Sequence, residues 1–419
     1  MANTTTTKTS GDNGTKQGGN NGDNTMTLSC VLGWMGSMAA VAVVFLAVAI
    51  MVVPRVLYTD LPPDVSLDLT SPTTMIVTGA NSGLGLASVM HFAHNEHATI
   101  IMACRSQTRC TSAKQRIYDI LGEEVVKAKL QPMSLDLSKK ESIEAFANEL
   151  RGQPIHILIN NAGLAGVFPD LEYNAENGIE THIHVNHLGH VRLMHCLWNN
   201  LQMAENARIV AVSSLMAAPA KIIPTFGWTQ DEPRYTTHWN GRMYGGSKRA
   251  NLFFANELHH RLMDDTALIG NKKNGSQISV VAAHPGFTQT DLCKNGCTGK
   301  NTFGRYLSNL KLLVGTIKMT AEDGALSQAY AAVVPQSGVY IGPSLALVGG
   351  PKILGQLDHS RHHMAFTRDE SKELWDKSLK ALGIEVFGDY KVPVENEEEV
   401  NVNEVAPEMM ESSEEVTTE

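Results

Sequence analysis

The chain lacks the features of a nucleic-acid-binding or metal-binding protein. Its basic residues do not cluster, whereas a nucleic-acid surface needs concentrated Lys and Arg, so no nucleic-acid partner is expected. Cysteine is scarce, with six in 419 residues. The closest pair, Cys293 and Cys297, has no second pair and no histidine at the spacing of a zinc site, so no metal site is predicted. We expect reduced, structural thiols, as in a protein body that faces the cytosol.

Positive charge is absent from the C-terminal segment. Residues 395–419 hold ten glutamates and no Lys or Arg. They account for the net charge of −9, because the other 394 residues carry 33 acidic and 34 basic groups. Large apolar residues are also rare from about Lys391 onward. Residues 391–419 are therefore predicted to form an acidic disordered tail.

Charge is also missing near the N-terminus. Residues 1–25 are rich in Asn, Thr and Gly with almost nothing apolar, which predicts a disordered polar tail. Residues 26–54 carry no charge, and residues 38–53 are almost wholly aliphatic. At about 1.5 Å per residue such a helix exceeds the roughly 30 Å hydrocarbon layer, so we predict one transmembrane anchor. A cleaved signal peptide and a buried core helix are the alternatives, and the long, charge-balanced N-terminal region disfavours the signal peptide.

The flanks of the predicted anchor bear on its orientation. Arg55 follows it directly and the charges of the N-terminal tail cancel, which favours a cytosolic protein body. Glycosylation sequons at Asn3 and Asn13 would suit a lumenal tail, although such sequons also arise by chance in an Asn- and Thr-rich segment. We expect a single-pass protein of the endoplasmic reticulum or another internal membrane, in contact with membrane lipid.

Strand and helix patterns alternate after a proline-containing linker over residues 55–72. Strands are expected at residues 75–77, 99–103, 126–130, 155–160, 209–212 and 278–282. Helices are expected at about residues 108–121, 139–150 and 322–333, after the turn at residues 78–85, and around Tyr244. This alternation predicts an α/β fold, a doubly wound (Rossmann-type) parallel sheet with helices on both faces, in one domain over residues 73–390.

A glycine-rich turn at residues 78–85 joins the first expected strand to a helix. Glycines let the backbone turn sharply and approach a pyrophosphate, and a helix N-terminus offers N–H groups to its charge. The spacing is T-G-x-x-x-G-x-G rather than G-x-G-x-x-G. A purely structural turn has the same appearance. The dinucleotide site that it indicates comprises Gly79, Asn81, Ser82, Gly83, Leu84 and Gly85.

The second expected strand is followed by arginine, where an NAD-binding protein usually carries an acidic residue. Arg105 comes directly after Cys104, Arg109 follows four residues later, and residues 99–107 contain no Asp or Glu. Arginine at this position accommodates the 2′-phosphate of NADP(H), so NADP(H) is the predicted cofactor. The alternative is a surface arginine without function.

Polar residues follow the next two strands. Asp136 and Leu137 end the third strand region, where the aspartate could also cap the following helix. The segment Asn160–Gly163, with the sequence N-N-A-G, follows the fourth strand. Two amides and two small residues make a tight turn beside a ligand, with Asn161 free to brace it.

Tyr244 and Lys248 are four residues apart, so a helix places them on one face. Tyrosine has a reference pKa of about 10, and a nearby ammonium group favours the phenolate, which suits the phenol to acid–base work. Ser213 and Ser214 leave the strand that ends at Val212. A hydroxyl there can bind a substrate oxygen.

Together these motifs resemble the short-chain dehydrogenase/reductase superfamily over about residues 73–383. The resemblance implies that Tyr244 is the general acid/base, that Lys248 lowers its pKa and binds the nicotinamide ribose, and that Ser214 holds the reacting oxygen. It also implies that Asn186 supports a proton relay and that Asp136 contacts the adenine. The implied cofactor-binding set is the glycine-turn residues with Arg105, Asp136, Leu137, Asn161, Ala162, Gly163, Tyr244, Lys248, Pro285, Gly286 and Thr288.

Within the superfamily, residues 102–105, 186–190 and 284–286 are similar to the retinol dehydrogenase branch. The resemblance implies a membrane-anchored NADP(H)-dependent oxidoreductase that interconverts a lipophilic alcohol and its aldehyde or ketone, of the retinoid, steroid or fatty aldehyde class. A protochlorophyllide reductase-like enzyme is an alternative, as is a catalytically silent cofactor-binding scaffold at the membrane. Many members of the superfamily pair through helices, so a homodimer is a further partner to consider.

Two segments are expected to face the substrate. Residues 215–243 contain Trp228, Tyr235 and Trp239, which either line an apolar pocket or pack over the sheet. Residues 288–318 are expected to form a flap, because loops at the carboxyl ends of strands carry specificity.

Overall fold

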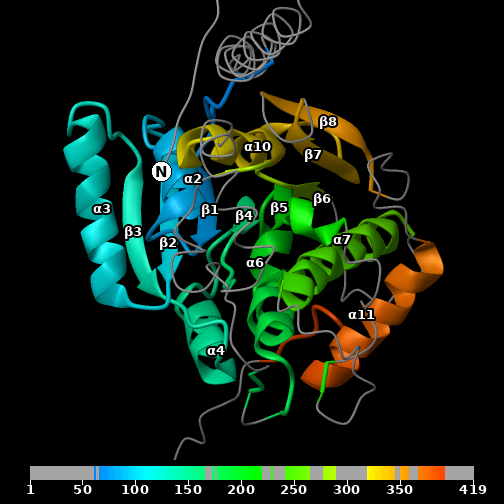
Figure 1. The fold of residues 1–419 in the computed structure, drawn as a ribbon. Coiled ribbons are helices and arrows are strands. Elements are labelled where there is room, and N and C mark those ends of the chain that lie inside the picture. Colours follow the sequence, from blue (N-terminus) through cyan, green and yellow to red (C-terminus); the bar gives the residue numbers. More distant parts are fainter. Residues whose placement is uncertain are drawn as a thin grey trace, which may run out of the picture. The chain divides into compact units, whose positions relative to one another are not determined.

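One eight-stranded sheet organises the fold (Figure 1). The computed structural model describes residues 61–62, 66–165, 172–174, 177–218, 228–229, 241–264, 277–288, 319–344, 350–357 and 367–391. The strand order is β3-β2-β1-β4-β5-β6-β7-β8. The strands are β1 (Thr73–Thr78), β2 (Ala98–Cys104), β3 (Lys129–Ser134), β4 (Ile157–Asn160), β5 (Asn206–Val212), β6 (Gln277–Ala283), β7 (Val339–Pro343) and β8 (Pro351–Gln356).

The chain reverses its winding direction between β1 and β4. Strands β1 to β7 run parallel, and β8 runs antiparallel to β7. In β1 and β4, Met75 pairs with Ile157 and Val77 with Ile159, so both strands end at the same edge of the sheet. The carboxyl ends of strands at such a reversal form the crevice in which α/β sheets bind their ligands.

Helices cover both faces of the sheet. One face is covered by α2 (Gly83–Phe92), α3 (Gln107–Leu121) and α10 (Ala321–Val333). The other is covered by α4 (Lys140–Glu149), α5 (Gly189–Cys196), α6 (Trp198–Met203), α7 (Gly241–Met263) and α11 (Arg368–Leu382). A π-helical turn, η1 (Ile183–Leu188), leads into α5, and a 3₁₀ turn, η2 (Leu215–Ala217), follows β5.

Successive residues of the central strands enter different hydrophobic cores. In β1, Met75 and Val77 pack with α2, α3 and α10, whereas Ile76 packs with the helices of the opposite face. Ile100 and Ile101 of β2 divide in the same way. Because both faces of the sheet are buried, the strands are continuous apolar runs and not alternating ones.

The C-terminal helix α11 packs on α7. Trp375 stacks on Phe254 with ring centroids 4.4 Å apart and an interplanar angle of 14°. Such an aromatic pair stabilises a fold by about 0.5–1.5 kcal/mol beyond the area that it buries. Thr367 and Glu370 form a capping box at the start of α11, and Gly383 ends it with a φ of 64°. Helix α11 is therefore part of the same core.

The predicted doubly wound sheet with helices on both faces is confirmed, but the strand prediction was wrong in two places. Strand β3 spans Lys129–Ser134 and not residues 126–130. It contains Pro132, which is tolerated because β3 lies at the edge of the sheet. Strands β7 and β8 were not predicted, because Gly and Pro interrupt their apolar residues. Since β8 is antiparallel, the sheet is not wholly parallel.

Several predicted segments lie outside the described residues. They are the polar tail (1–25), the transmembrane anchor (26–54), residues 55–60 and 63–65 of the linker, and the acidic tail beyond Lys391. Within the described part of the chain, no helix is both long enough and apolar enough to cross a membrane.

Candidate active site

The carboxyl ends of β1, β2, β4 and β5 open onto one cleft of about 480 Å³, a volume typical of small-molecule sites. Most of the residues predicted to bind a dinucleotide line it. They are Gly79, Asn81, Ser82, Gly83, Leu84, Gly85, Arg105, Asp136, Leu137, Asn161, Ala162, Gly163, Tyr244, Lys248 and Pro285. Gly286 and Thr288 follow Pro285 but do not line the cleft, and neither do Asn186 and Ser214, which contact residues that do.

The glycine turn is closed by two positions that exclude a side chain. Gly79 has a φ of 69°, in the left-handed region that favours glycine. A Cβ on Gly85 would lie only 2.3 Å from the Gly79 carbonyl oxygen. Helix α2 begins at Gly83, and the side chain of its N-cap, Ser82, makes no capping hydrogen bond within the described structure. Its first N–H groups are therefore available to an anion in the cleft.

Two exposed arginines line the cleft where β2 ends. Arg105 directly follows β2, and Arg109 lies in the first turn of α3. A disulfide joins Cys104 to Cys110 on either side of them, with Cα atoms 5.7 Å apart. The prediction of reduced thiols was wrong for this pair, because the turn from β2 into α3 brings together two cysteines that show no recognisable spacing. Cys196 is a buried free thiol, and burial raises its pKa to about 12.

Asp136 lines the cleft beyond β3. Its carboxylate accepts hydrogen bonds from the Ser138 backbone N–H at 3.0 Å and from the Ser138 hydroxyl at 2.7 Å. This is an Asx turn, and the N-cap of α4 is Lys139, so the alternative of a helix cap by Asp136 was wrong. The adenine contact of Asp136 stays a prediction. The Leu137 carbonyl packs so closely on α5 that a Cβ on Gly189 would lie 2.5 Å from it.

Thr78 joins the ends of β1 and β4. Its Oγ1 accepts hydrogen bonds from the backbone N–H groups of Asn161 and Ala162, both at 2.9 Å. The Asn161 amide donates to the Thr78 carbonyl at 2.8 Å, so Asn161 braces the turn as predicted. A Cβ on Gly163 would lie 3.3 Å from Lys248 Nζ. Glycine at this position therefore leaves room for the lysine side chain.

Asn186 lies in the π-helical turn η1 and clamps the N-N-A-G turn to α7. Its Oδ1 accepts from the Leu164 N–H at 2.8 Å, and its Nδ2 donates to the Leu164 carbonyl and to Ser247 Oγ, both at 3.0 Å. Its backbone carbonyl accepts from Asn251 Nδ2 at 3.1 Å and from the His190 ring at 2.9 Å. Asn186 thus positions its neighbours, and its part in a proton relay stays a prediction.

Helix α7 presents Tyr244 and Lys248 to the cleft one turn apart. Tyr244 is hydrogen-bonded to Ser214, and Lys248 Nζ donates to the Val212 carbonyl at 3.1 Å. The Ser213 hydroxyl instead donates to the Lys248 carbonyl at 2.9 Å. The geometry therefore agrees with the choice of Ser214, and not Ser213, as the partner of Tyr244.

Burial shifts the pKa of both groups toward their neutral forms. It raises the pKa of Tyr244, and the hydrogen bond from Ser214 opposes that rise. It lowers the pKa of Lys248 to about 8. The direction for Tyr244 is opposite to the prediction that Lys248 lowers its pKa, because here the loss of solvent around the phenolate outweighs other effects.

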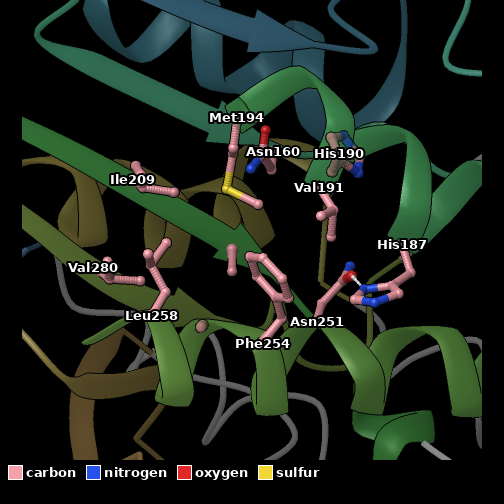
Figure 2. Close-up of a pocket in the computed structure, with 12 residues that line it drawn as sticks. Asn160, His187, His190, Val191, Met194, Ile209, Asn251, Phe254, Leu258 and Val280 are labelled. Carbon is pink, nitrogen blue, oxygen red and sulfur yellow. Dashed lines mark hydrogen bonds between the residues drawn. The ribbon is translucent and has the colours of Figure 1, made fainter. Parts of the chain in front are cut away.

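Two buried histidines lie behind the cleft. Figure 2 shows His187 and His190 beside a small cavity of about 20 Å³ between α5 and α7, whose other walls include Met194 and Phe254. Burial lowers the pKa of His187 to about 4 and that of His190 to about 3. Both imidazoles are therefore neutral at pH 7.

Four residues of this network were missed by the sequence prediction. Thr78 is the first residue of the glycine-turn motif and was not assigned a role. Ser247 and Asn251 share one face of α7 with Tyr244, at the i+3 and i+7 positions, and that spacing could have found them. His190 lies in the segment 186–190 that carries the resemblance but was assigned no role, because its hydrogen bonds to β1 and η1 depend on the tertiary structure.

The predicted substrate segments are only partly described. Trp228 is buried, with its ring centroid 6.0 Å from that of His187, and Lys377 Nζ lies 4.6 Å from the Trp228 ring. Of the two alternatives for this residue, packing is confirmed. Tyr235, Trp239 and residues 289–318 lie outside the described residues.

Known proteins are similar to this chain in sequence and in fold. The short chain dehydrogenase family profile matches residues 73–224. Human retinol dehydrogenase 12 is 31% identical over 317 residues, which cover 74% of this chain and 86% of that protein. Chicken WW domain-containing oxidoreductase is 37% identical over 197 residues, 46% of each chain, so this chain matches less than half of that relative. A crystal structure of an uncharacterised protein from Mycobacterium paratuberculosis has a TM-score of 0.55 and 28% identity, covering 75% of this chain and 95% of that one.

The two neutral histidines predict a loss of stability in mild acid. Below pH 6.5 the unfolded chain protonates these imidazoles, whereas the folded chain does not until about pH 4 for His187 and about pH 3 for His190. The free energy of unfolding should therefore fall with pH by up to about 1.4 kcal/mol per pH unit for each histidine. Urea denaturation between pH 7 and pH 5 measures this slope. His190→Asn should make this slope smaller by up to about 1.4 kcal/mol per pH unit, because one proton fewer is taken up on unfolding. An unchanged slope would mean that the pKa of His190 is the same in the folded and the unfolded chain.

Proposed function

Because the chain belongs to the short-chain dehydrogenase/reductase superfamily and is similar to its retinol dehydrogenase branch, we propose that it is a membrane-anchored, NADP(H)-dependent oxidoreductase. Its reaction interconverts a lipophilic alcohol and the corresponding aldehyde or ketone. One observation carries the proposal: Tyr244, hydrogen-bonded to Ser214 and one turn from Lys248, shares a cleft with the glycine turn.

The cleft residues fit a dinucleotide that carries a 2′-phosphate. The glycine turn has no room for side chains at Gly85, and the N-terminus of α2 has N–H groups for a pyrophosphate. Arg105 and Arg109 are exposed on the lining where β2 ends, and no carboxylate stands among residues 99–107. Arginine in place of an acidic residue supports NADP(H) over NAD(H).

Three side chains divide the proton chemistry. When bound, the nicotinamide supplies or accepts the hydride. Tyr244 donates a proton to the substrate oxygen in reduction and takes it back in oxidation. Ser214, hydrogen-bonded to Tyr244, orients that oxygen. Lys248, close behind Gly163, binds the ribose.

Two features support a lipophilic substrate. Human retinol dehydrogenase 12, a retinoid enzyme by its name, matches this chain over 86% of its own length. The uncharged residues 26–54 can hold the catalytic domain at a bilayer, where it meets molecules that partition into lipid. Retinal, steroid ketones and fatty aldehydes are the classes to test.

Replacing Tyr244 by Phe tests the chemistry directly. The full-length chain in mild detergent, with NADPH and all-trans-retinal, should lose at least about a hundredfold in kcat, because the proton donor is gone. The dissociation constant for NADPH, measured by fluorescence, should stay within about threefold, because the ring remains. Tyr118→Phe, on α3 and outside the cleft lining, is the matched control and should behave as wild type.

A different result would favour the other candidate function. If wild type binds NADPH tightly but turns over none of the retinal, steroid ketone or fatty aldehyde substrates, a cofactor-binding scaffold becomes the better description. Turnover of protochlorophyllide in light would instead place the chain with that group of reductases.

Replacing Arg105 by Ala tests the cofactor. The dissociation constant for NADPH should rise about tenfold or more, since a charge-assisted hydrogen bond contributes about 1.5–3 kcal/mol, while that for NADH stays unchanged. Lys127→Ala removes the same charge from an exposed position outside the cleft lining and should leave both constants unchanged. Equal losses for both cofactors would contradict a 2′-phosphate site.

Membrane attachment is tested by extraction. We expect the full-length chain to stay with microsomes in alkaline carbonate, with the catalytic domain accessible to protease from the cytosolic side. A variant with Val44→Lys and Leu46→Lys should be released, because charges at the centre of a span cost about 2.5–3.5 kcal/mol each. Complete release of the wild-type chain would contradict the anchor.

A further inference from the structure

His190 lies between the dinucleotide half and the proton-transfer half of the proposed site. Its Nδ1 is 2.9 Å from the Asn186 carbonyl oxygen, and its Nε2 is 3.0 Å from Thr78 Oγ1. All three side chains are buried. The ring therefore bridges the end of β1 and the π-helical turn η1, two segments that are more than 100 residues apart in sequence.

The partners of His190 determine where its proton lies. A carbonyl oxygen can only accept, so Nδ1 carries the hydrogen and donates it to Asn186. The Nε2 atom then has a free lone pair and accepts from the Thr78 hydroxyl. The opposite tautomer would leave Nδ1 facing the carbonyl with no hydrogen between them. One neutral tautomer of His190 thus satisfies both contacts.

Thr78 is fully satisfied by the same assignment. Its hydroxyl hydrogen points to His190, and its two lone pairs accept from the backbone N–H groups of Asn161 and Ala162. The other acceptor near Thr78 Oγ1, the Ile159 carbonyl, is farther away at 3.3 Å. The Thr78 hydroxyl is therefore the point at which His190 is joined to the strand ends beside the glycine turn.

The Asn186 carbonyl continues the connection to α7. It accepts from Asn251 Nδ2 at 3.1 Å, while the Asn186 amide donates to Ser247 Oγ at 3.0 Å. Ser247 and Asn251 flank Lys248 on α7, and the Ser247 hydroxyl donates to the Tyr244 carbonyl at 2.7 Å. An unbroken series of hydrogen bonds thus runs from the glycine turn to the helix that carries the proton donor.

We propose that His190 is a positioning residue that holds the glycine turn and the Tyr244 helix in one fixed geometry through Thr78 and the Asn186 carbonyl. His190 is buried and is not among the residues that line the cleft. The proposal rests on the function given above, since the two halves matter together only in hydride and proton transfer. The two ring nitrogens have different roles: Nε2 contacts Thr78 beside the glycine turn, and Nδ1 contacts the Asn186 carbonyl on the side of Tyr244.

Two conservative variants separate the two nitrogens. The amide of His190→Asn reaches the place of Nδ1 and can still donate to the Asn186 carbonyl, but it cannot reach Thr78. The amide of His190→Gln reaches the place of Nε2 and can still accept from Thr78, but it leaves the Asn186 carbonyl. Thr78→Val removes the hydroxyl that contacts His190 Nε2, and Thr78→Ser keeps it. The matched control is His195→Asn. His195 is another buried histidine of α5, and its Nδ1 accepts a hydrogen bond from the Gly388 N–H.

The full-length variants are compared in mild detergent by the dissociation constant for NADPH and by kcat with all-trans-retinal. Thr78→Val and His190→Asn should each raise the dissociation constant about tenfold, the equivalent of one hydrogen bond, and the double variant should be no worse than either. His190→Gln should keep the dissociation constant within about twofold and lower kcat about tenfold. Thr78→Ser should bind NADPH as wild type does, and His195→Asn should change the melting temperature only.

Other outcomes are decisive as well. Equal effects of His190→Asn and His190→Gln on binding and turnover, or additive effects in the double variant, would mean that His190 is merely a packed residue and would overturn the proposal. If His190→Asn does not fold, the dissociation constants of Thr78→Val and Thr78→Ser for NADPH still decide whether the contact between His190 and Thr78 supports cofactor binding. Failure of the wild-type chain to bind NADPH would reject the proposed function itself. Binding without turnover of retinal would reject only the substrate, and the dissociation constants would still decide the role of His190.

Discussion

The parallel pairing of β1 with β4 is the constraint on which the site depends. The two strands are neighbours in the sheet but are separated in sequence by β2, α3, β3 and α4. Their pairing places Thr78 beside the Asn160–Gly163 turn, so that one hydroxyl can accept from two backbone N–H groups. The glycine turn, the N-N-A-G turn and the cleft between them all follow from that contact.

The interior behind the cleft is polar, and its two imidazoles, those of His187 and His190, are neutral at pH 7. A buried polar group is costly unless its hydrogen bonds are made, and a buried charge costs more. The chain meets this requirement with amides, hydroxyls and two imidazoles that burial keeps neutral. Because each donor faces a particular acceptor, the network tolerates few other arrangements.

Tyr244 and Lys248 are the titratable groups that meet the cleft from α7, and burial moves both pKa values toward neutral forms. At pH 7 the phenol holds its proton, which is the form that donates to a carbonyl oxygen. A lysine with a pKa of about 8 is close to the point at which it exchanges protons readily. The protonated phenol of Tyr244 is the form that the proposed reduction of a carbonyl group requires.

Local chemistry was enough to predict the α/β class, the glycine turn, most strand positions and the Tyr244 and Lys248 pair, because each depends on residues close in sequence. The choice of Ser214 came from the family resemblance. Buried parallel strands are apolar runs, and i, i+4 spacing places two side chains on one helical face. The bounds of β3, with Pro132, and the strands β7 and β8 were not predictable in this way. Strands β3 and β8 lie at the two edges of the sheet, where Pro and Gly are tolerated, and Gly342 and Pro343 end the short apolar run of β7. The Cys104–Cys110 contact, the direction of the Tyr244 pKa shift and the part played by Thr78 and His190 were decided by the tertiary structure. Each depends on which groups burial brings together and on how much water it removes, and no single stretch of sequence contains that information.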